Sequence, residues 1–76
     1  MGWQKYVDSD PQILFGKPKI KGARITVELI LEKLGESLSE KELLESYPHI
    51  TKSQIKACLQ FAAHHLKSEQ GFPAAS

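Results

Sequence analysis

The spacing of hydrophobic residues predicts a first helix that begins after Thr26. Its apolar positions recur every three or four residues, which is the period of an amphipathic helix: Val27, Ile30, Leu31 and Leu34. Thr26 has the side chain of a helix N-cap, and Gly35 stands where a left-handed residue would end the helix. We therefore expect a helix of about two turns between these two residues.

Two further helix starts carry one shared signal. Ser39 can accept a hydrogen bond from the backbone three residues on while Glu42 reaches back, and Thr51 and Gln54 repeat this capping box. Flanking apolar pairs would close each start as a hydrophobic staple: Leu38 with Leu43, and Ile50 with Ile55. Because only a short turn around Pro48 separates the two helices, the pattern suggests a helix-turn-helix.

These starts define a short second helix and a long third one. The second runs from about Glu40 to Ser46, before Pro48 prevents its continuation, and its expected buried residues are Leu43, Leu44 and Tyr47. The third begins after Thr51, and its expected inner face is Ile55, Leu59, Ala62 and Leu66, with Cys58 near the edge. The expected outward residues are Lys52, Ser53, Lys56, Gln60 and Lys67.

The residues before Thr26 predict little regular structure. The aromatic and β-branched content from Trp3 to Val7 predicts a short strand, and the turn residues at 8–11 end it. Between Ile13 and Ile25 we expect a β-turn or hairpin with Ile20 and Ile25 turned inward. The predicted fold is mainly α: a three-helix helix-turn-helix (homeodomain-like) bundle with a short N-terminal β-element, forming one domain over 1–70 before a loose tail at 71–76.

Length and charge narrow the possible functions. A chain of 76 residues forms one domain at most, and a core of that size contributes roughly 3–5 kcal/mol of net stability, which makes an oligomer or a partner plausible. The net charge is only +1, but residues 1–27 carry five basic against two acidic side chains, which gives +3. Such a basic half is typical of a surface that meets phosphates or an acidic partner.

Candidate DNA-reading residues lie at the start of the third helix. In tri-helical DNA-binding domains the first turns of the last helix enter the major groove. The residues placed to do so here are Lys52, Ser53, Lys56 and Gln60. Lysine can donate to guanine edges or phosphates and glutamine can pair with adenine, whereas a helix face can equally be polar only because it is solvated. Periodicity alone leaves DNA binding and protein binding equally open.

One segment also resembles a known family. The residues 16–26 read Gly-Lys-Pro-Lys-Ile-Lys-Gly-Ala-Arg-Ile-Thr, and Tyr47-Pro48 follows later before the final capped helix. Over about Tyr6 to Ala63 the chain resembles the small prokaryotic family called domain of unknown function 433. The resemblance implies a helix-turn-helix domain with an N-terminal β-element, among antitoxin-like partners of nuclease-like proteins of the PIN type. Ala23 departs from the family pattern, which usually has threonine at this position.

The same segment predicts a stiff basic loop. Gly16 and Gly22 allow backbone conformations closed to other residues, and Pro18 fixes the chain between them. The loop's basic residues are Lys17, Lys19, Lys21 and Arg24. They could grip a DNA backbone, or could dock into the carboxylate-rich metal site of a PIN-type nuclease and compete with its metal ions. An alternative for Arg24 is a surface pair with Glu28 four residues on.

Enzyme chemistry finds no support in the residue types present. Neither an acid, base and nucleophile set nor a phosphate-cradling glycine loop is evident, and adjacent His64 and His65 would point about 100° apart on a helix. We therefore expect no cofactor, no metal and no catalysis. No apolar run is long enough to span a membrane and the start lacks a secretory signal, so with its lone Cys58 the protein is expected in the cytoplasm.

Together with what the family resemblance implies, these observations predict an antitoxin-like regulator that binds its own promoter DNA and neutralises a PIN-type nuclease-like toxin. The alternative is a protein-only inhibitor or adaptor without DNA binding. A homodimer is expected through the N-terminal strand or the final helix, because a small domain must be doubled to cover two DNA half-sites.

Overall fold

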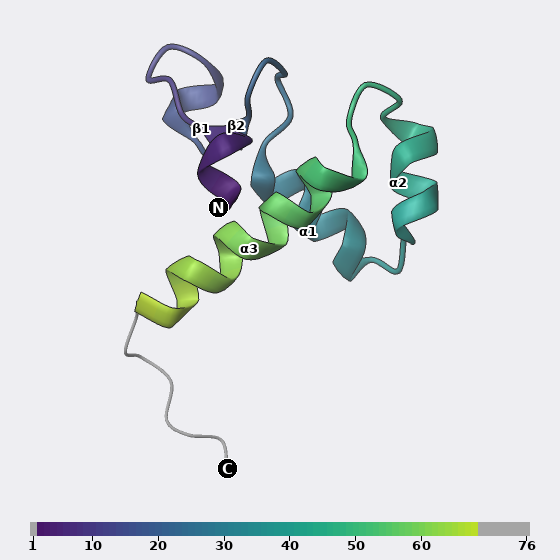
Figure 1. Ribbon diagram of the computed structural model, residues 1–76. Helices are drawn as coiled ribbons and strands as arrows, with labels where there is room; N and C mark the ends of the chain where they lie inside the picture. Colours follow the sequence, from purple (N-terminus) through teal and green to yellow (C-terminus); the bar gives the residue numbers. More distant parts are fainter. Residues whose placement is uncertain (1, 69–76) are drawn as a thin grey trace.

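The computed structural model describes residues 2–68, which form a mainly helical domain with a two-stranded antiparallel sheet (Figure 1). The helices are α1 (Val27–Gly35), α2 (Glu40–Ser46) and α3 (Lys52–Ser68). The strands are β1 (Val7–Asp8) and β2 (Lys19–Ile20). A 3₁₀ turn precedes each strand: η1 (Trp3–Lys5) lies before β1, and η2 (Leu14–Gly16) lies before β2. The expected tail at 71–76 lies outside the described residues.

All three predicted helix starts are confirmed. The hydroxyl of Thr26 accepts a hydrogen bond from the backbone of Leu29 at 3.0 Å. Ser39 and Glu42 form the reciprocal capping box of α2, with distances of 3.1 and 2.7 Å. Thr51 and Gln54 repeat it before α3, at 3.2 and 2.9 Å. Since each start satisfies backbone N–H groups that the helix leaves unpaired, the boundaries follow from local chemistry.

The expected strand from Trp3 to Val7 is wrong for most of its length. Residues 3–5 form the η1 turn instead, with the backbone N–H of Tyr6 bonded to the carbonyl of Trp3 at 2.8 Å, and η1 packs against α3. The turn brings the Trp3 ring edge-to-face onto Phe61, with centroids 4.9 Å apart. Burial of the indole on α3 therefore outweighs the strand preference of the segment.

The sheet is small, as expected, and its second strand leads directly into a tight turn. Val7 lies opposite Ile20 in the antiparallel register, and the backbone N–H of Lys21 donates to the carbonyl of Tyr6 at 2.9 Å. Within the predicted hairpin, Ala23 donates to Ile20 at 3.0 Å across a turn in which Gly22 has φ +78°. That left-handed conformation explains the glycine.

Helix α1 ends at Gly35, but Gly35 is not the left-handed residue that the sequence predicted. Positive φ occurs two residues later, at Ser37, whose φ is 80°. The N–H of Ser37 bonds to the carbonyl of Leu34 and that of Leu38 to Lys33, at 3.2 and 3.1 Å. This is the hydrogen-bond pattern of a Schellman motif, with serine at the position where glycine is usual.

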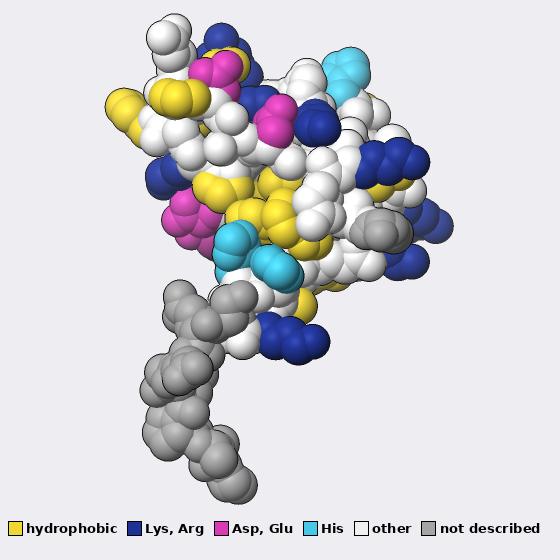
Figure 2. All heavy atoms as spheres, turned by 60° about the vertical axis from the view of Figure 1, so that its left-hand side comes forward, with side chains coloured by type: hydrophobic (Ala, Val, Ile, Leu, Met, Phe, Trp, Pro, Cys, Tyr) yellow, Lys and Arg dark blue, Asp and Glu magenta, His cyan; other side chains and the backbone are white. Residues whose placement is uncertain are grey.

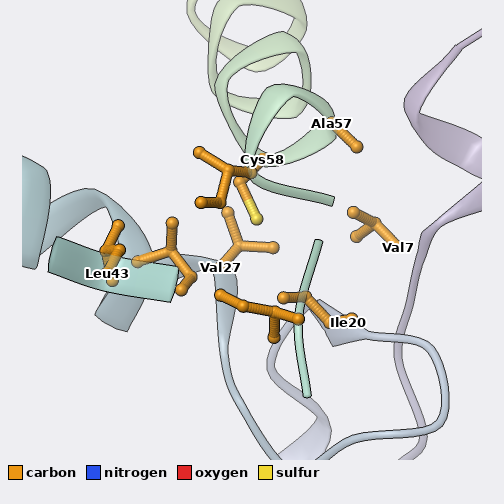
Figure 3. Close-up of a cluster of buried hydrophobic side chains, with 9 residues drawn as sticks. Val7, Ile20, Val27, Leu43, Ala57 and Cys58 are labelled. Carbon is orange, nitrogen blue, oxygen red and sulfur yellow. The ribbon is translucent and has the colours of Figure 1, made fainter. Parts of the chain in front are cut away.

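Side chains from every helix and both strands meet in one core (Figure 3). Its buried members are Val7, Ile20, Val27, Ile30, Leu43, Ile50, Ile55, Ala57 and Cys58. Ile20 is inside as predicted, while Ile25, Leu44 and Tyr47 are partly buried against the core. The core thus joins the N-terminal β-element to the three helices.

The inner face of α3 is rotated from the one that periodicity predicted. Cys58 is fully buried rather than at the edge, and the aromatic ring of Phe61 packs against the core. Leu59 and Leu66, expected inside, are 49% and 65% exposed. The physical reason is that Trp3 packs against Phe61. The side of α3 that carries Phe61 is therefore covered, and the side that carries Leu59 is not.

Candidate nucleic-acid interface

The four candidate DNA-reading residues lie together on α3. Their side chains are all exposed: Lys52, Ser53, Lys56 and Gln60. At 100° per residue they occupy an arc of about 100° and span about 12 Å of the helix axis. The structure therefore brings together one polar, basic surface at the N-terminal half of α3.

Local chemistry positions this surface. Thr51 and Gln54 close the capping box at the start of α3, so the Gln54 side chain is engaged and the first turn is held. Ile50 and Ile55 are buried on either side of the cap and attach the helix start to the core. The lysines at 52 and 56 consequently project from a fixed helix start that follows the short turn after α2.

The predicted basic loop is divided by the structure. Lys19 is only 5% exposed, and its ammonium lies 2.9 Å from a carboxylate oxygen of Asp8 on the neighbouring strand. Lys17 is exposed but pairs with Glu28 at 3.1 Å, so the partner of Glu28 in the described chain is Lys17 rather than Arg24. Of the four basic residues of the loop, Lys19 is the one whose charge is used within the sheet, because a nearly buried cation needs a counter-charge.

Lys21 and Arg24 remain as exposed positive charges of this segment. They lie on either side of Gly22, in the turn between β2 and α1. Arg24 and Lys17 also border a surface hollow of about 350 Å³ whose wall includes the carboxylates of Glu28 and Glu32. The hollow is of mixed charge, which is a poor arrangement for binding a phosphate group.

Sequence reasoning missed an aromatic cluster at the junction of η1 and α3. The rings of Trp3, Phe61, His64 and His65 contact one another edge-on or tilted. The Phe61 and His65 centroids are 4.2 Å apart, and the Trp3 and His64 centroids are 5.5 Å apart. Figure 2 shows hydrophobic side chains gathered on this face with histidines beside them. Spacing along α3 gave no hint of it, because the partner ring lies more than fifty residues earlier in the chain.

The cluster adjoins an apolar groove. One hollow of about 390 Å³ lies between α1 and α3, and another of about 330 Å³ lies between η1, β1 and α3. Both share Pro18 and Phe61 as walls, so they are neighbouring parts of one depression in the surface. Apolar side chains rather than polar ones line most of it, which suits a protein segment better than a charged small molecule.

The thiol of Cys58 lies inside the core. Burial raises the pKa of the Cys58 thiol to about 11, which keeps it protonated and unreactive at neutral pH. Within residues 2–68, no three His, Cys, Asp or Glu side chains gather closely enough to hold a metal ion. Across the same residues, none of the helices has the length and apolar character needed to cross a membrane.

Fold and surface together define a small, mainly helical domain with a short antiparallel sheet, a basic helix face and a separate apolar groove. Residues 7–62 match the model of the family described as Protein of unknown function (DUF433), and the chain belongs to that family. This confirms the resemblance seen in the sequence. Neither the curated proteins nor the solved structures contain a significant match to the chain.

Proposed function

We propose that this protein is an antitoxin-like, non-enzymatic regulator that binds its own promoter through a helix-turn-helix formed by α2 and α3. Its proposed partner is a PIN-type nuclease-like protein. The observation that carries the DNA-binding part is the exposed, basic face of α3, which begins directly after a rigidly capped turn.

The chemistry of that face suits a major groove. Lys52 and Lys56 supply positive charge one helical turn apart, and Gln60 follows one turn later with an amide that can pair with adenine. Ser53 adds a hydroxyl for a phosphate oxygen. The turn between β2 and α1 projects toward the same side of the molecule as the turn between α2 and α3 (Figure 1), so Lys21 and Arg24 can assist by contacting the DNA backbone.

Replacement of Lys52 and Lys56 tests the DNA-binding part. In fluorescence anisotropy with the upstream DNA, the double alanine variant should bind roughly tenfold or more weakly, and its affinity should depend less steeply on salt. The matched control is the pair Lys5→Ala and Lys33→Ala, two lysines on η1 and α1 that lie outside the proposed helix-turn-helix, which removes the same charge. Equal losses in both variants, or no loss in either, would reject α3 as the DNA reader.

The partner surface is tested at the basic loop residues that the structure leaves exposed. Reversing Lys19 would break its buried pair with Asp8 and disturb the fold, whereas Lys21 and Arg24 are exposed. With the charge of Lys21 and Arg24 reversed to glutamate, a PIN-type protein encoded beside this chain should no longer co-purify. Lys5→Glu is the control that should retain it, and retention by the double variant would place the contact elsewhere.

The apolar groove favours a second candidate function, that of a protein-only inhibitor or adaptor. Its walls lack the positive charge that nucleic acid requires. If the wild-type protein binds native and scrambled duplexes equally weakly while it still captures the nuclease-like partner, this second function replaces the first.

A further inference from the structure

Phe15, in the η2 turn, has its aromatic ring almost entirely in solvent. The side chain is 96% exposed, compared with 65% for Leu66 and 49% for Leu59. A single exposed apolar side chain is ordinary on a protein surface. Phe15 differs from the two leucines in its backbone, because they lie in the regular helix α3 and it does not.

The backbone of η2 is left-handed at three successive residues. The φ angles of Leu14, Phe15 and Gly16 are 53°, 59° and 75°. Glycine adopts this conformation without steric cost, whereas the Cβ of leucine or phenylalanine is crowded by the following carbonyl. Glycine at position 15 would remove that crowding, so the phenylalanine destabilises the turn that carries it. Strain of this kind is concentrated at binding and catalytic sites.

Hydrogen bonds within the turn hold the ring in its outward position. The backbone N–H of Gly16 donates to the carbonyl of Ile13 at 3.0 Å, and that of Lys17 donates to the carbonyl of Leu14 at 3.1 Å. These two bonds fix the chain on both sides of Phe15. An aromatic ring on a fixed backbone loses little conformational freedom when a partner buries it, because only two side-chain torsions remain.

The charges beside the turn indicate which class of partner would cover the ring. Leu14 borders the hollow of about 350 Å³ whose wall also includes Lys17, Arg24, Glu28 and Glu32. Lys17 and Glu28 neutralise each other across 3.1 Å, which leaves one basic and one acidic side chain, both exposed. Nucleic acid is uniformly negative and requires a surplus of positive charge. A surface of mixed charge around an aromatic ring is instead typical of an interface with protein.

We propose that the ring of Phe15 is the anchor of the partner-binding surface: it enters an apolar pocket of the partner protein, while Arg24 faces a carboxylate beside that pocket. The loop that carries η2 and the turn between β2 and α1 project to the same side of the molecule (Figure 1), so one partner can contact both. Interfaces between proteins gain most of their binding energy from a few such aromatic and arginine side chains. This step rests on the proposed function, since it takes the nuclease-like protein as the partner.

Replacement of Phe15 by asparagine tests the anchor. Asparagine tolerates the left-handed conformation and removes the ring. In calorimetric titrations with the purified nuclease-like protein encoded beside this chain, Phe15→Asn should have a Kd roughly tenfold or more above that of the wild type. The matched control is Leu66→Asn, which makes the same kind of change at an exposed apolar residue on α3 and should bind as the wild type does.

Thermal unfolding separates a binding role of Phe15 from a structural one. The ring contributes almost no packing and its backbone is strained, so Phe15→Asn should not lower the midpoint of unfolding. Phe15→Gly should raise the midpoint by roughly 2–4 °C. A residue that supported the fold would have the opposite effect, and a fall in the midpoint of both variants would overturn the assignment of Phe15 to binding.

The heat capacity and the salt dependence of binding identify the two contacts. Burial of an apolar ring makes the heat capacity change of binding more negative, so Phe15→Asn should bind with a less negative value and an unchanged salt dependence. Arg24→Ala should do the reverse, because it removes an ion pair and leaves the apolar contact. An unchanged heat capacity change in Phe15→Asn would contradict burial of the ring.

The outcomes of these titrations distinguish the anchor from the proposed function. If the wild type and Phe15→Asn bind the nuclease-like protein equally, the anchor is wrong while the proposed partner stands. If the wild type does not bind that protein, the proposed partner and the anchor are both rejected. The two proteins should bind the upstream DNA equally, and a loss of DNA affinity in Phe15→Asn would make the ring a wedge between base pairs, which also overturns the anchor.

Discussion

At the scale of single residues, the most informative departure from expectation is Ser37. A side chain with a Cβ is disfavoured at its φ of 80°, by roughly 1 kcal/mol or more. The hydrogen bonds of Ser37 and Leu38 back to the last turn of α1 hold it there, because they satisfy carbonyls that the helix end would otherwise leave unpaired. Local strain is thus balanced by the closing of a helix.

Ser37→Gly should stabilise the protein. Glycine removes the steric cost of the left-handed conformation but also makes the unfolded chain more flexible, so the net gain should be about 0.5 kcal/mol. Urea unfolding followed by circular dichroism measures it, with Ser37→Ala as the control that keeps the Cβ and should give no gain. Loss of stability in the glycine variant would mean that the serine side chain itself supports the turn.

At the scale of elements, the two strands are joined by few backbone hydrogen bonds and by one ion pair. Lys19 on β2 is nearly buried, while its partner Asp8 on β1 is 43% exposed. The pair explains why a lysine can occupy an inward position in this small sheet, next to fully buried Ile20. A charged side chain here is part of the fold rather than part of a binding surface.

Removal of one partner should reveal the role of this pair. Asp8→Ala leaves the Lys19 ammonium without its counter-charge in a nearly buried place, which should cost about 1–2 kcal/mol, less than a fully buried pair because Asp8 is partly solvated. Lys19→Met should cost less, since no unpaired charge remains buried. Lys17→Met breaks the exposed pair with Glu28 and should change the free energy of unfolding by no more than about 0.5 kcal/mol.

In the helices, sequence patterns predict the N-caps fully and the buried faces only in part. All three N-caps are where the sequence predicts them, because a cap depends on residues within one turn of each other. The apolar face of α3 is predicted only in part: Ile55 is buried, but Leu59 and Leu66 are exposed. Periodicity identifies apolar positions without indicating what covers them, and here the single chain covers only some.

At the scale of the whole molecule, Cys58 lies where the elements of the core meet. Its side chain is fully buried, because side chains from β1, β2, α1 and α3 surround it (Figure 3). Burial raises the pKa of its thiol to about 11 from the ordinary 9.0, since an ionised sulfur would lose its hydration.

Alkaline pH should therefore destabilise the folded protein through Cys58. The unfolded thiol ionises near pH 9, whereas the folded thiol keeps its proton until about pH 11, so this contribution is constant below pH 9 and falls between the two values. Urea unfolding of the wild type and of Cys58→Ala across this range measures it. The stability difference between the two proteins should shrink as the pH rises, and a constant difference would contradict the buried, protonated thiol.

The sequence by itself determined the helix starts, the left-handed turn at Gly22, the exposed candidates Lys52, Ser53, Lys56 and Gln60, and the family, because each depends on residues close together in the chain. Only the tertiary structure decided that Trp3 joins a turn against Phe61, that Lys19 is buried with Asp8, and that Leu59 and Leu66 stay exposed. Those outcomes depend on which distant elements lie opposite each side chain, since burial and ion pairing are gained between elements and not within them.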